Sequence, residues 1–304
     1  MIDLCELSGR EKKKLMHLCQ PLEKVKLSQL DFSKGCFAIS EKVDGVFCLA
    51  LKLHDRVSIF SRTGELYTSM GHIEEELNRT LRDQEIIIFE ATAKGFHTEQ
   101  ATVSGWCRDK KNQHPALIAA CHTYLTLSAF QGTQEMTFSY SNSLLSERIK
   151  ETYGRYVAGV SCYKIPSKAV GSLEEAQAYA DRFIAKGREG VILRNHSAIY
   201  EGGKRNLALI KIKERLSVDL KVLDVYEGNG KYSGNLGGLI CQWKDGKTIR
   251  ISGMTDEQRK AWWENPQEII GKIVQVDAMK ESSKGLLREP RFKGIRFDKL
   301  EGDY

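Results

Sequence analysis

Short runs of apolar residues recur along the chain from residue 36 onward. Runs that are rich in Val, Ile and Phe and bounded by turn residues predict β-strands. The strands predicted in the first two thirds of the chain are 36–39, 46–51, 57–60, 85–90, 190–194 and 207–213. Apolar residues at helical spacing predict helices over 73–81, 143–153 and 172–185. The last of these begins with Ser172-Leu-Glu-Glu, a sequence typical of a capping box. This mixture predicts an α+β fold with antiparallel sheet.

The pattern differs at both ends of the chain. Near the start, leucines spaced among lysines predict a short amphipathic helix within residues 11–30, interrupted at Pro21. After Ser217, short strands alternate with Gly-rich turns, and a single helix is predicted over 256–264. The strands predicted there are 220–226, 239–243, 248–251 and 273–279. Such a series predicts a small Greek-key barrel of the OB type, and hence two domains, 1–216 and 217–304.

Composition and charge narrow the setting. The 304 residues include 46 Lys and Arg against 40 Asp and Glu, a net charge of +6 that permits a polyanionic partner without requiring one. The eight cysteines form no C-x-x-C pair, which predicts reduced thiols. No apolar run is long enough to cross a membrane, and the first residues lack the apolar core of a signal peptide. We therefore expect a cytoplasmic protein that is neither secreted nor attached to a membrane.

Lys42 is the first candidate for chemistry. It lies in the sequence Ser40-Glu41-Lys42-Val43-Asp44-Gly45, at the end of a predicted strand. A lysine attacks an electrophile only as the free amine, so burial or a neighbouring cation must lower its pKa. Asp44 and Gly45 would form the turn that directs the amine inward. Taken alone, the short motif fits a solvated turn lysine equally well.

Two further groups of cations follow. Lys211 and Lys213 lie on one face of a predicted strand, because side chains alternate along a strand. A phosphate chain would satisfy this pair, and the pair would lower the pKa of a nearby nucleophilic lysine. A second group ends the chain with Arg288, Arg291, Lys293, Arg296 and Lys299. The alternative interpretations are a charged edge strand for the lysine pair and a solubilising basic tail for the second group.

The order of these motifs resembles that of the covalent nucleotidyltransferases, the superfamily of polynucleotide ligases and mRNA capping guanylyltransferases. The shared motifs are Lys42-x-Asp-Gly, Ser61-Arg-Thr-Gly, Glu90, Glu189-Gly-Val, Lys211-x-Lys213 and Arg296-x-Asp-Lys299. The stretch Tyr200-Glu-Gly-Gly-Lys-Arg before the paired lysines, and the opening of the predicted barrel at Glu227-Gly-Asn-Gly, are similar to those of ATP-dependent DNA ligases. The resemblance implies an ATP-grasp-like nucleotidyltransferase domain with antiparallel sheets followed by an OB-fold domain.

The resemblance also implies roles for individual residues. Lys42 would take AMP from ATP, pass it to the 5′-phosphate of a nick, and so let the 3′-hydroxyl displace it. Arg296 and Lys299 would orient the leaving pyrophosphate, and Glu90 and Glu189 would bind Mg²⁺, for which Mn²⁺ could substitute. The remaining nucleotide-binding residues would be Ser40, Glu41, Asp44, Gly45, Arg62, Tyr124, Lys211 and Lys213. The residues implied to bind nucleic acid are Arg62, Lys204, Arg205, Arg288, Arg291 and Lys293.

Some features leave alternatives open. Tyr124 is the first choice for the ring that stacks on adenine and His122 the second, because the Phe-Asp pair usual in the family is missing here. Phe47 replaces an arginine usual in DNA ligases, which favours somewhat an RNA ligase. ATP is favoured over NAD, because the 41 residues before Lys42 leave no room for a nicotinamide-binding domain. GTP, as in capping guanylyltransferases, stays open.

The expected partner is nicked duplex DNA and the expected state a monomer, acting in the cytoplasm of a cell or of a virus-infected host. A non-catalytic nucleic-acid-binding module is the alternative from another class, and the complete set of motif residues argues against it.

Overall fold

The computed structural model describes residues 2–33, 36–93, 100–153, 161–214, 216–281 and 285–304. The chain separates into two compact units, Met1–Lys213 and Glu214–Tyr304, and the sequence-based boundary was placed after residue 216. All eight cysteines are free thiols, as predicted. Among the described residues, no helix is both long enough and apolar enough to span a membrane.

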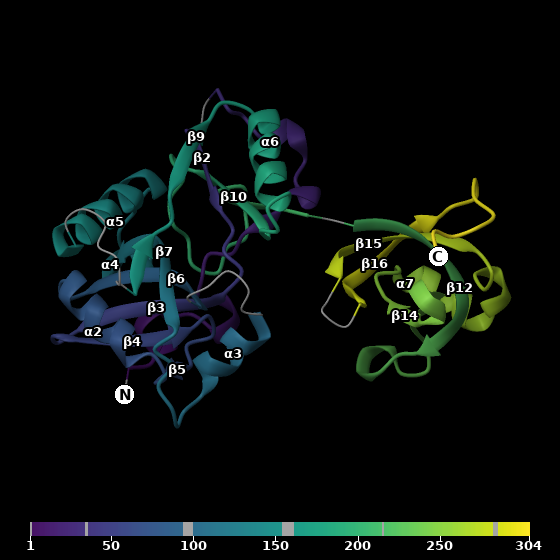
Figure 1. Cartoon of the computed structure of the whole chain (residues 1–304), viewed down its shortest axis with the longest axis horizontal. Helices are drawn as coiled ribbons and strands as arrows, with labels where there is room; N and C mark the ends of the chain where they lie inside the picture. Colours follow the sequence, from purple (N-terminus) through teal and green to yellow (C-terminus); the bar gives the residue numbers. More distant parts are fainter. Residues whose placement is uncertain (1, 34–35, 94–99, 154–160, 215, 282–284) are drawn as a thin grey trace. The chain divides into compact units, whose positions relative to one another are not determined.

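A six-stranded sheet forms the larger part of the first unit (Figure 1). Its strands, in spatial order, are β5 (Leu66–Tyr67), β4 (Arg56–Ser61), β3 (Val46–Leu53), β6 (Glu85–Ala93), β7 (Leu117–Thr126) and β8 (Cys162–Lys164). Neighbouring strands are antiparallel except β7 and β8. The central strands β3 and β6 are almost continuously apolar because both of their faces are buried, as Leu49 and Ile87 illustrate. The helices of this part are α1 (Leu4–Ser8), α2 (Gly71–Thr80), α3 (Gln100–Arg108), α4 (Leu127–Gln131) and α5 (Phe138–Tyr153).

A second, five-stranded sheet completes the first unit. Its strands, in order, are β1 (Gln20–Pro21), β11 (Leu209–Lys213), β10 (Gly190–Asn195), β2 (Phe37–Glu41) and β9 (Ser167–Val170). Helix α6 (Leu173–Ile184) packs on this sheet, and the buried Ala176 and Ala180 face it (Figure 1). Ser172 forms the first half of the predicted capping box, since its hydroxyl accepts from the Glu175 N–H at 3.1 Å. The Glu175 carboxylate accepts from the Gly171 N–H at 2.9 Å.

The helix predicted within residues 11–30 is absent. The segment instead forms β1 and three short 3₁₀ turns, η1 (Lys12–Lys14), η2 (Leu22–Lys24) and η3 (Leu27–Gln29). Two interactions with distant parts of the chain explain the difference. Leu15 and Met16 are buried in the core of the larger sheet, and the backbone at Gln20 and Pro21 pairs in parallel with β11. Tertiary burial and strand pairing therefore replace the local helix.

The second unit contains a single curled antiparallel sheet (Figure 1). Its strands, in order, are β14 (Thr248–Ile251), β13 (Leu236–Gln242), β12 (Leu216–Glu227), β15 (Ile273–Glu281) and β16 (Leu287–Ile295). A bridge between Ser252 and Arg291 brings the two edges of the sheet together. The other elements are η4 (Gly230–Tyr232), η5 (Lys244–Gly246), α7 (Asp256–Glu264) and η6 (Pro266–Glu268). The curled sheet with one helix confirms the predicted α+β class with an OB-like second domain.

Candidate active site

Lys42 lies where the chain passes from one sheet to the other. Strand β2 of the smaller sheet ends at Glu41, and β3 of the larger sheet begins at Val46. The Lys42 N–H donates to the Gly190 carbonyl at 2.9 Å, which ties this crossing to the start of β10. The Lys42 ammonium contacts one carboxylate oxygen of Glu189, and Lys213 contacts the other. A single carboxylate thus joins residues from three segments far apart in the sequence.

The charges around Lys42 correct one expectation. Burial works to lower the pKa of Lys42, but attraction to Glu189 and to Glu90 outweighs it and leaves the pKa above its usual value. The lysine whose pKa is lowered is instead Lys211. Burial is the main cause, followed by repulsion from Lys213 and Lys42. The prediction that paired lysines lower the pKa of Lys42 is therefore wrong for this state, in which Glu189 keeps Lys42 protonated.

Glu90 belongs to the same cluster. It lies on β6 directly opposite Phe47 of β3. Burial raises the pKa of Glu90 to about 7, although Lys42 opposes the shift. Asp44 raises the pKa of Glu90 further and Arg62, an exposed residue, lowers it, so both predicted nucleotide-binding residues lie within its field.

Glu90 and Glu189 offer the hard oxygen ligands that Mg²⁺ requires, and Mg²⁺ sites often use only one or two carboxylates and complete their coordination with phosphates and water. Both carboxylates act on the charge of Lys42. The pKa of Glu189 is lowered on balance: burial opposes this, but attraction to Lys42 and hydrogen bonds with Lys213 and Lys42 outweigh it. Within the described part of the chain, no group of three or more potential metal ligands occurs. The donor set therefore fits a metal that is shared with a phosphate-bearing ligand.

Two glycines allow the strands of the site to approach closely. A Cβ atom at Gly45 would lie 2.5 Å from the Ala91 carbonyl oxygen on β6. At Gly190 the φ angle is 138°, and a Cβ atom would lie 2.1 Å from the Ile212 carbonyl oxygen on β11. Gly45 was predicted for its turn, but the close approach to β6 is what requires it.

The remaining predicted residues of the Lys42 motif lie on β2. Ser40 pairs with Ile192 of β10, and the Glu41 carboxylate contacts the Arg188 guanidinium at 3.4 Å.

Tyr124 does not fit the predicted adenine-stacking role. Tyr124 is buried in the core and only 2% exposed. It interacts with Glu85 of β6 and with Arg148 of α5. Its strand carries a bulge at His122, because Thr123 and Cys121 pair with consecutive residues of β6. His122, the second choice, lies within the electrostatic field of Lys42.

Burial lowers the pKa of His122 to about 3, and repulsion from Arg194 and Lys42 adds to the effect. The imidazole of His122 lies with its centroid 6.3 Å from that of Phe47. Arg194, to which the sequence analysis assigned no role, donates from its guanidinium to the His122 carbonyl at 2.6 Å. Burial lowers the pKa of Arg194 to about 10.

Lys204 and Arg205 lie on an exposed loop that the N-terminal segment holds in place. His17 is buried beneath this loop, and its Nδ1 accepts from the Glu201 N–H at 3.0 Å. The Arg205 guanidinium donates to the Cys19 carbonyl at 2.6 Å. Sequence reasoning missed His17, whose partner lies 184 positions away.

The second unit carries the other predicted cations. Arg288, Arg291 and Lys293 lie on β16, and the last two are exposed on either side of the buried Phe292. Lys293 contacts Asp277 at 3.5 Å, and Arg291 donates to the Ser252 hydroxyl at 3.2 Å.

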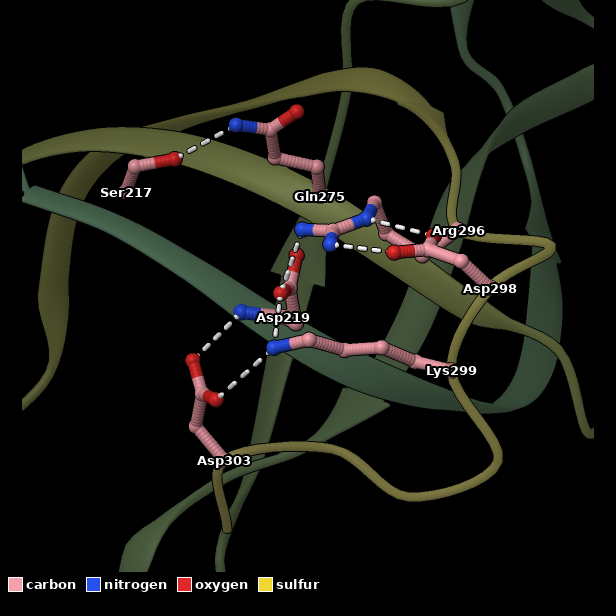
Figure 2. Close-up of polar contacts among 7 residues, drawn as sticks. All are labelled: Ser217, Asp219, Gln275, Arg296, Asp298, Lys299 and Asp303. Carbon is pink, nitrogen blue, oxygen red and sulfur yellow. Dashed lines mark hydrogen bonds and ion pairs between the residues drawn. The ribbon is translucent and has the colours of Figure 1, made fainter.

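Arg296 and Lys299 follow β16 and meet at one acidic residue (Figure 2). Both contact Oδ2 of Asp219, Arg296 at 2.7 Å and Lys299 at 2.5 Å. Asp298 binds the Arg296 guanidinium through two further hydrogen bonds of 2.9 and 2.7 Å. Asp303 lies 3.6 Å from Lys299 and accepts from the Asp219 N–H at 2.7 Å. No motif in the sequence pointed to Asp219 or Asp303.

Comparison with known proteins shows the family of the chain. A family model described as "ATP dependent DNA ligase domain" matches residues 16–213, and one described as "DNA ligase OB-like domain" matches residues 227–296. The first match alone covers more than half of the chain, and the chain therefore belongs to the ATP-dependent DNA ligase family.

Individual relatives match parts of the chain. It is 30% identical over 158 residues to a "Probable DNA ligase" of Anaeromyxobacter sp. (strain K), which covers 45% of this chain and 30% of that protein. It is 24% identical over 335 aligned positions to the "DNA ligase" of Enterobacteria phage T4, covering 86% of this chain and 66% of that protein. The chain thus spans less than two thirds of the length of these curated relatives.

A solved structure described as "DNA binding with a minimal scaffold: Structure-function analysis of Lig E DNA ligases" has the same fold. Its TM-score is 0.68 at 16% identity, over 92% of this chain and 98% of that one.

Proposed function

We propose that this chain seals nicks in duplex DNA that carry a 5′-phosphate and a 3′-hydroxyl, using ATP and passing through a lysyl-AMP and a DNA-adenylate. The observation that supports this most is the cluster of Lys42, Glu189, Lys213 and Glu90 within a chain of the ATP-dependent DNA ligase family. The names of the curated relatives support the same activity. We propose that the protein acts as a monomer.

In the first step, the Lys42 amine forms a bond to the α-phosphorus of ATP while the bond to the bridging oxygen breaks and pyrophosphate leaves. Lys42 must first lose the proton that Glu189 now stabilises. Lys211 and Lys213 lie on the same strand, and both would bind the α-phosphate; Lys213 shares the Glu189 carboxylate with Lys42. Catalysis of this kind consists mostly of alignment and charge neutralisation.

Glu90 and Glu189 would hold Mg²⁺, or Mn²⁺ in its place. The bound cation would neutralise phosphate charge and compete with Lys42 for the two carboxylates. Ser40, Glu41, Asp44, Gly45 and Arg62 would complete the nucleotide site. His122 beside Phe47 replaces Tyr124 as the candidate for contact with the base, because Lys42 acts on its charge whereas the Tyr124 ring is buried in the core.

In the later steps AMP passes to the 5′-phosphate and the 3′-hydroxyl displaces it. The candidates for contact with the DNA backbone are Arg62, Lys204 and Arg205 in the first unit and Arg288, Arg291 and Lys293 in the second. Binding through phosphate contacts should weaken steeply as salt rises, because neutralisation of phosphates releases counterions.

The test offers the protein a 5′-phosphorylated nick in duplex DNA with Mg²⁺, in parallel with ATP, GTP, NAD or no nucleotide. We expect joined product with ATP only. Labelling of the protein by GTP would favour a capping guanylyltransferase. Much better joining of an RNA 3′-hydroxyl strand would favour an RNA ligase, and would make Phe47 the first position to examine. Duplex binding without any covalent nucleotide would leave a non-catalytic binding module.

Substitution of Lys42 tests its role as nucleophile. Lys42→Ala should abolish transfer of labelled AMP to the protein and sealing of an unadenylated nick, because no other amine takes its place. Lys168→Ala is the matched control, since Lys168 lies on the same sheet but is exposed, and its ammonium contacts the surface carboxylate of Glu175 at 3.0 Å and lies 5.5 Å from the centroid of the Tyr179 ring. Undiminished AMP transfer in a clean preparation of Lys42→Ala would remove Lys42 as the nucleophile.

A further inference from the structure

Asp219 occupies an unusual place among the charges of the second unit (Figure 2). One of its carboxylate oxygens, Oδ2, receives both the Arg296 guanidinium and the Lys299 ammonium. The other oxygen, Oδ1, is buried and has no hydrogen-bond partner among the described residues. The two cations are therefore held close to each other by a single atom, in addition to their separate partners Asp298 and Asp303.

The carboxylate is the fixed member of this group. Asp219 lies within β12, pairs with Gln275 of β15, and its side chain is 7% exposed. Arg296 and Lys299 lie beyond the last strand, and their side chains are 30% and 37% exposed. Two long side chains on a turn have many rotamers, and contact with a buried carboxylate on a sheet restricts them to one arrangement.

Asp219 is also tied to the end of the chain. Its N–H donates to the Asp303 carboxylate and its carbonyl accepts from the Asp303 N–H, both at 2.7 Å. A Cβ atom at Gly302 would lie only 2.9 Å from the Asp219 carbonyl oxygen, so the chain end packs tightly against this part of β12. These backbone contacts hold Asp219 in place independently of the two cations.

We propose that Asp219 is a positioning residue for the nucleotide-attachment step, which it serves by presenting Arg296 and Lys299 together to one phosphate chain. This inference rests on the proposed function, in which the two cations orient pyrophosphate. Donors that share one oxygen atom are close enough to bind neighbouring oxygens of a single pyrophosphate. Their preset arrangement lowers the entropy that must be lost when the phosphate chain is bound.

The net charge of the cluster explains how Arg296 and Lys299 can leave Asp219 for a phosphate chain. Asp219, Asp298 and Asp303 together carry one more formal charge than Arg296 and Lys299. At rest, the cations are thus neutralised and hydrogen-bonded rather than free to bind other polyanions. A phosphate chain carries more than one negative charge and can compete for both cations at once.

The experiment separates the two halves of the reaction. Asp219→Asn keeps the shape of the side chain and removes its charge. We expect transfer of labelled AMP from ATP to the protein to fall at least about tenfold, whereas sealing of a nick that already carries 5′-AMP should stay within about twofold of the unsubstituted protein. Asp224→Asn is the matched control, because Asp224 is an exposed acidic residue on the same strand. Equal losses in the two assays would overturn the proposal.

A double-mutant cycle provides the decisive comparison. If Asp219 acts through Lys299 and Arg296, then Asp219→Asn should cause little further loss of AMP transfer in a chain that already carries Arg296→Ala and Lys299→Ala. Losses that multiply would show that Asp219 acts in another way and would overturn the proposal. To measure the residual rates, the assay uses single-turnover conditions with excess ATP.

Two further measurements keep the result interpretable. Thermal unfolding shows whether Asp219→Asn folds, and if it does not, Asp219→Glu takes its place by keeping the charge while displacing the oxygens. Asp219→Glu should lose AMP transfer selectively, and unchanged AMP transfer would refute the proposal. The proposed function fails separately if the unsubstituted chain forms no lysyl-AMP, or if Lys299→Ala leaves AMP transfer intact.

Discussion

Gly45→Ala is a small substitution that should disturb both folding and chemistry. The added Cβ atom would lie 2.5 Å from the Ala91 carbonyl oxygen, 3.3 Å from its carbon and 3.2 Å from the Glu90 Cβ. Ordinary contacts of a Cβ atom begin near 3.4 Å, so β3 and β6 must separate by roughly 1 Å at this point. The oxygen belongs to the backbone of a central strand and cannot rotate away.

The expected cost in stability follows from overpacking of a well-packed sheet. The free energy of unfolding should fall by about 1–3 kcal/mol, measured by urea denaturation. The same separation moves Lys42 relative to Glu90, which lies next to Ala91. Misplacement by roughly 1 Å can reduce a rate by about a hundredfold. The rate of lysyl-AMP formation at saturating ATP should therefore fall by one to two orders of magnitude.

Gly105→Ala is the matched control. Gly105 lies inside helix α3, and a Cβ atom there would meet nothing within 4 Å. The substitution should leave AMP transfer unchanged and raise the free energy of unfolding by up to about 1 kcal/mol, because alanine favours helix. The close approach of Gly45 to β6 is refuted as a requirement if Gly45→Ala matches the unsubstituted chain in both assays. It is also refuted if stability falls while the rate of AMP transfer does not.

Two predictions concern buried charges. Without metal or nucleotide, Glu90→Gln should stabilise the protein at high pH. The folded-state pKa of Glu90 is about 7, against an ordinary 4.5, so its contribution is fully favourable below 4.5 and is lost as pH rises to 7. The difference in pKa corresponds to about 3 kcal/mol, and urea denaturation in EDTA should show the advantage of Glu90→Gln growing from pH 5 to pH 8. A constant difference would contradict the assignment. Arg148→Met should lower the free energy of unfolding by about 3–5 kcal/mol, because it leaves Glu85 buried without the guanidinium that contacts it at 2.6 and 2.9 Å. A loss below about 1 kcal/mol would show that the site is hydrated.

Elements with a strong local pattern were predicted well. Helix α7 spans Asp256–Glu264, the predicted range, because Thr255 and Gln258 form a capping box within four consecutive residues. Strands β3 and β6 also lie where apolar runs placed them. The N-terminal segment failed for the opposite reason: Leu15 and Met16 are buried among residues far along the chain, and no local pattern reports such burial.

The site residues also divide into those that the sequence indicated and those that only the structure revealed. The residue types at Lys42, Glu90 and Glu189 and their order along the chain were sufficient to indicate the family, which a match over residues 16–213 shows. No local pattern of residues indicated the raised pKa of Lys42, because Glu189 contacts it from 147 positions away. Nor did any such pattern indicate Asp219, which lies 77 positions from Arg296. Sequence determines which side chains are present and how they repeat locally. Electrostatic and steric energies depend on distances between atoms, and for residues remote in sequence only the tertiary structure decides those distances.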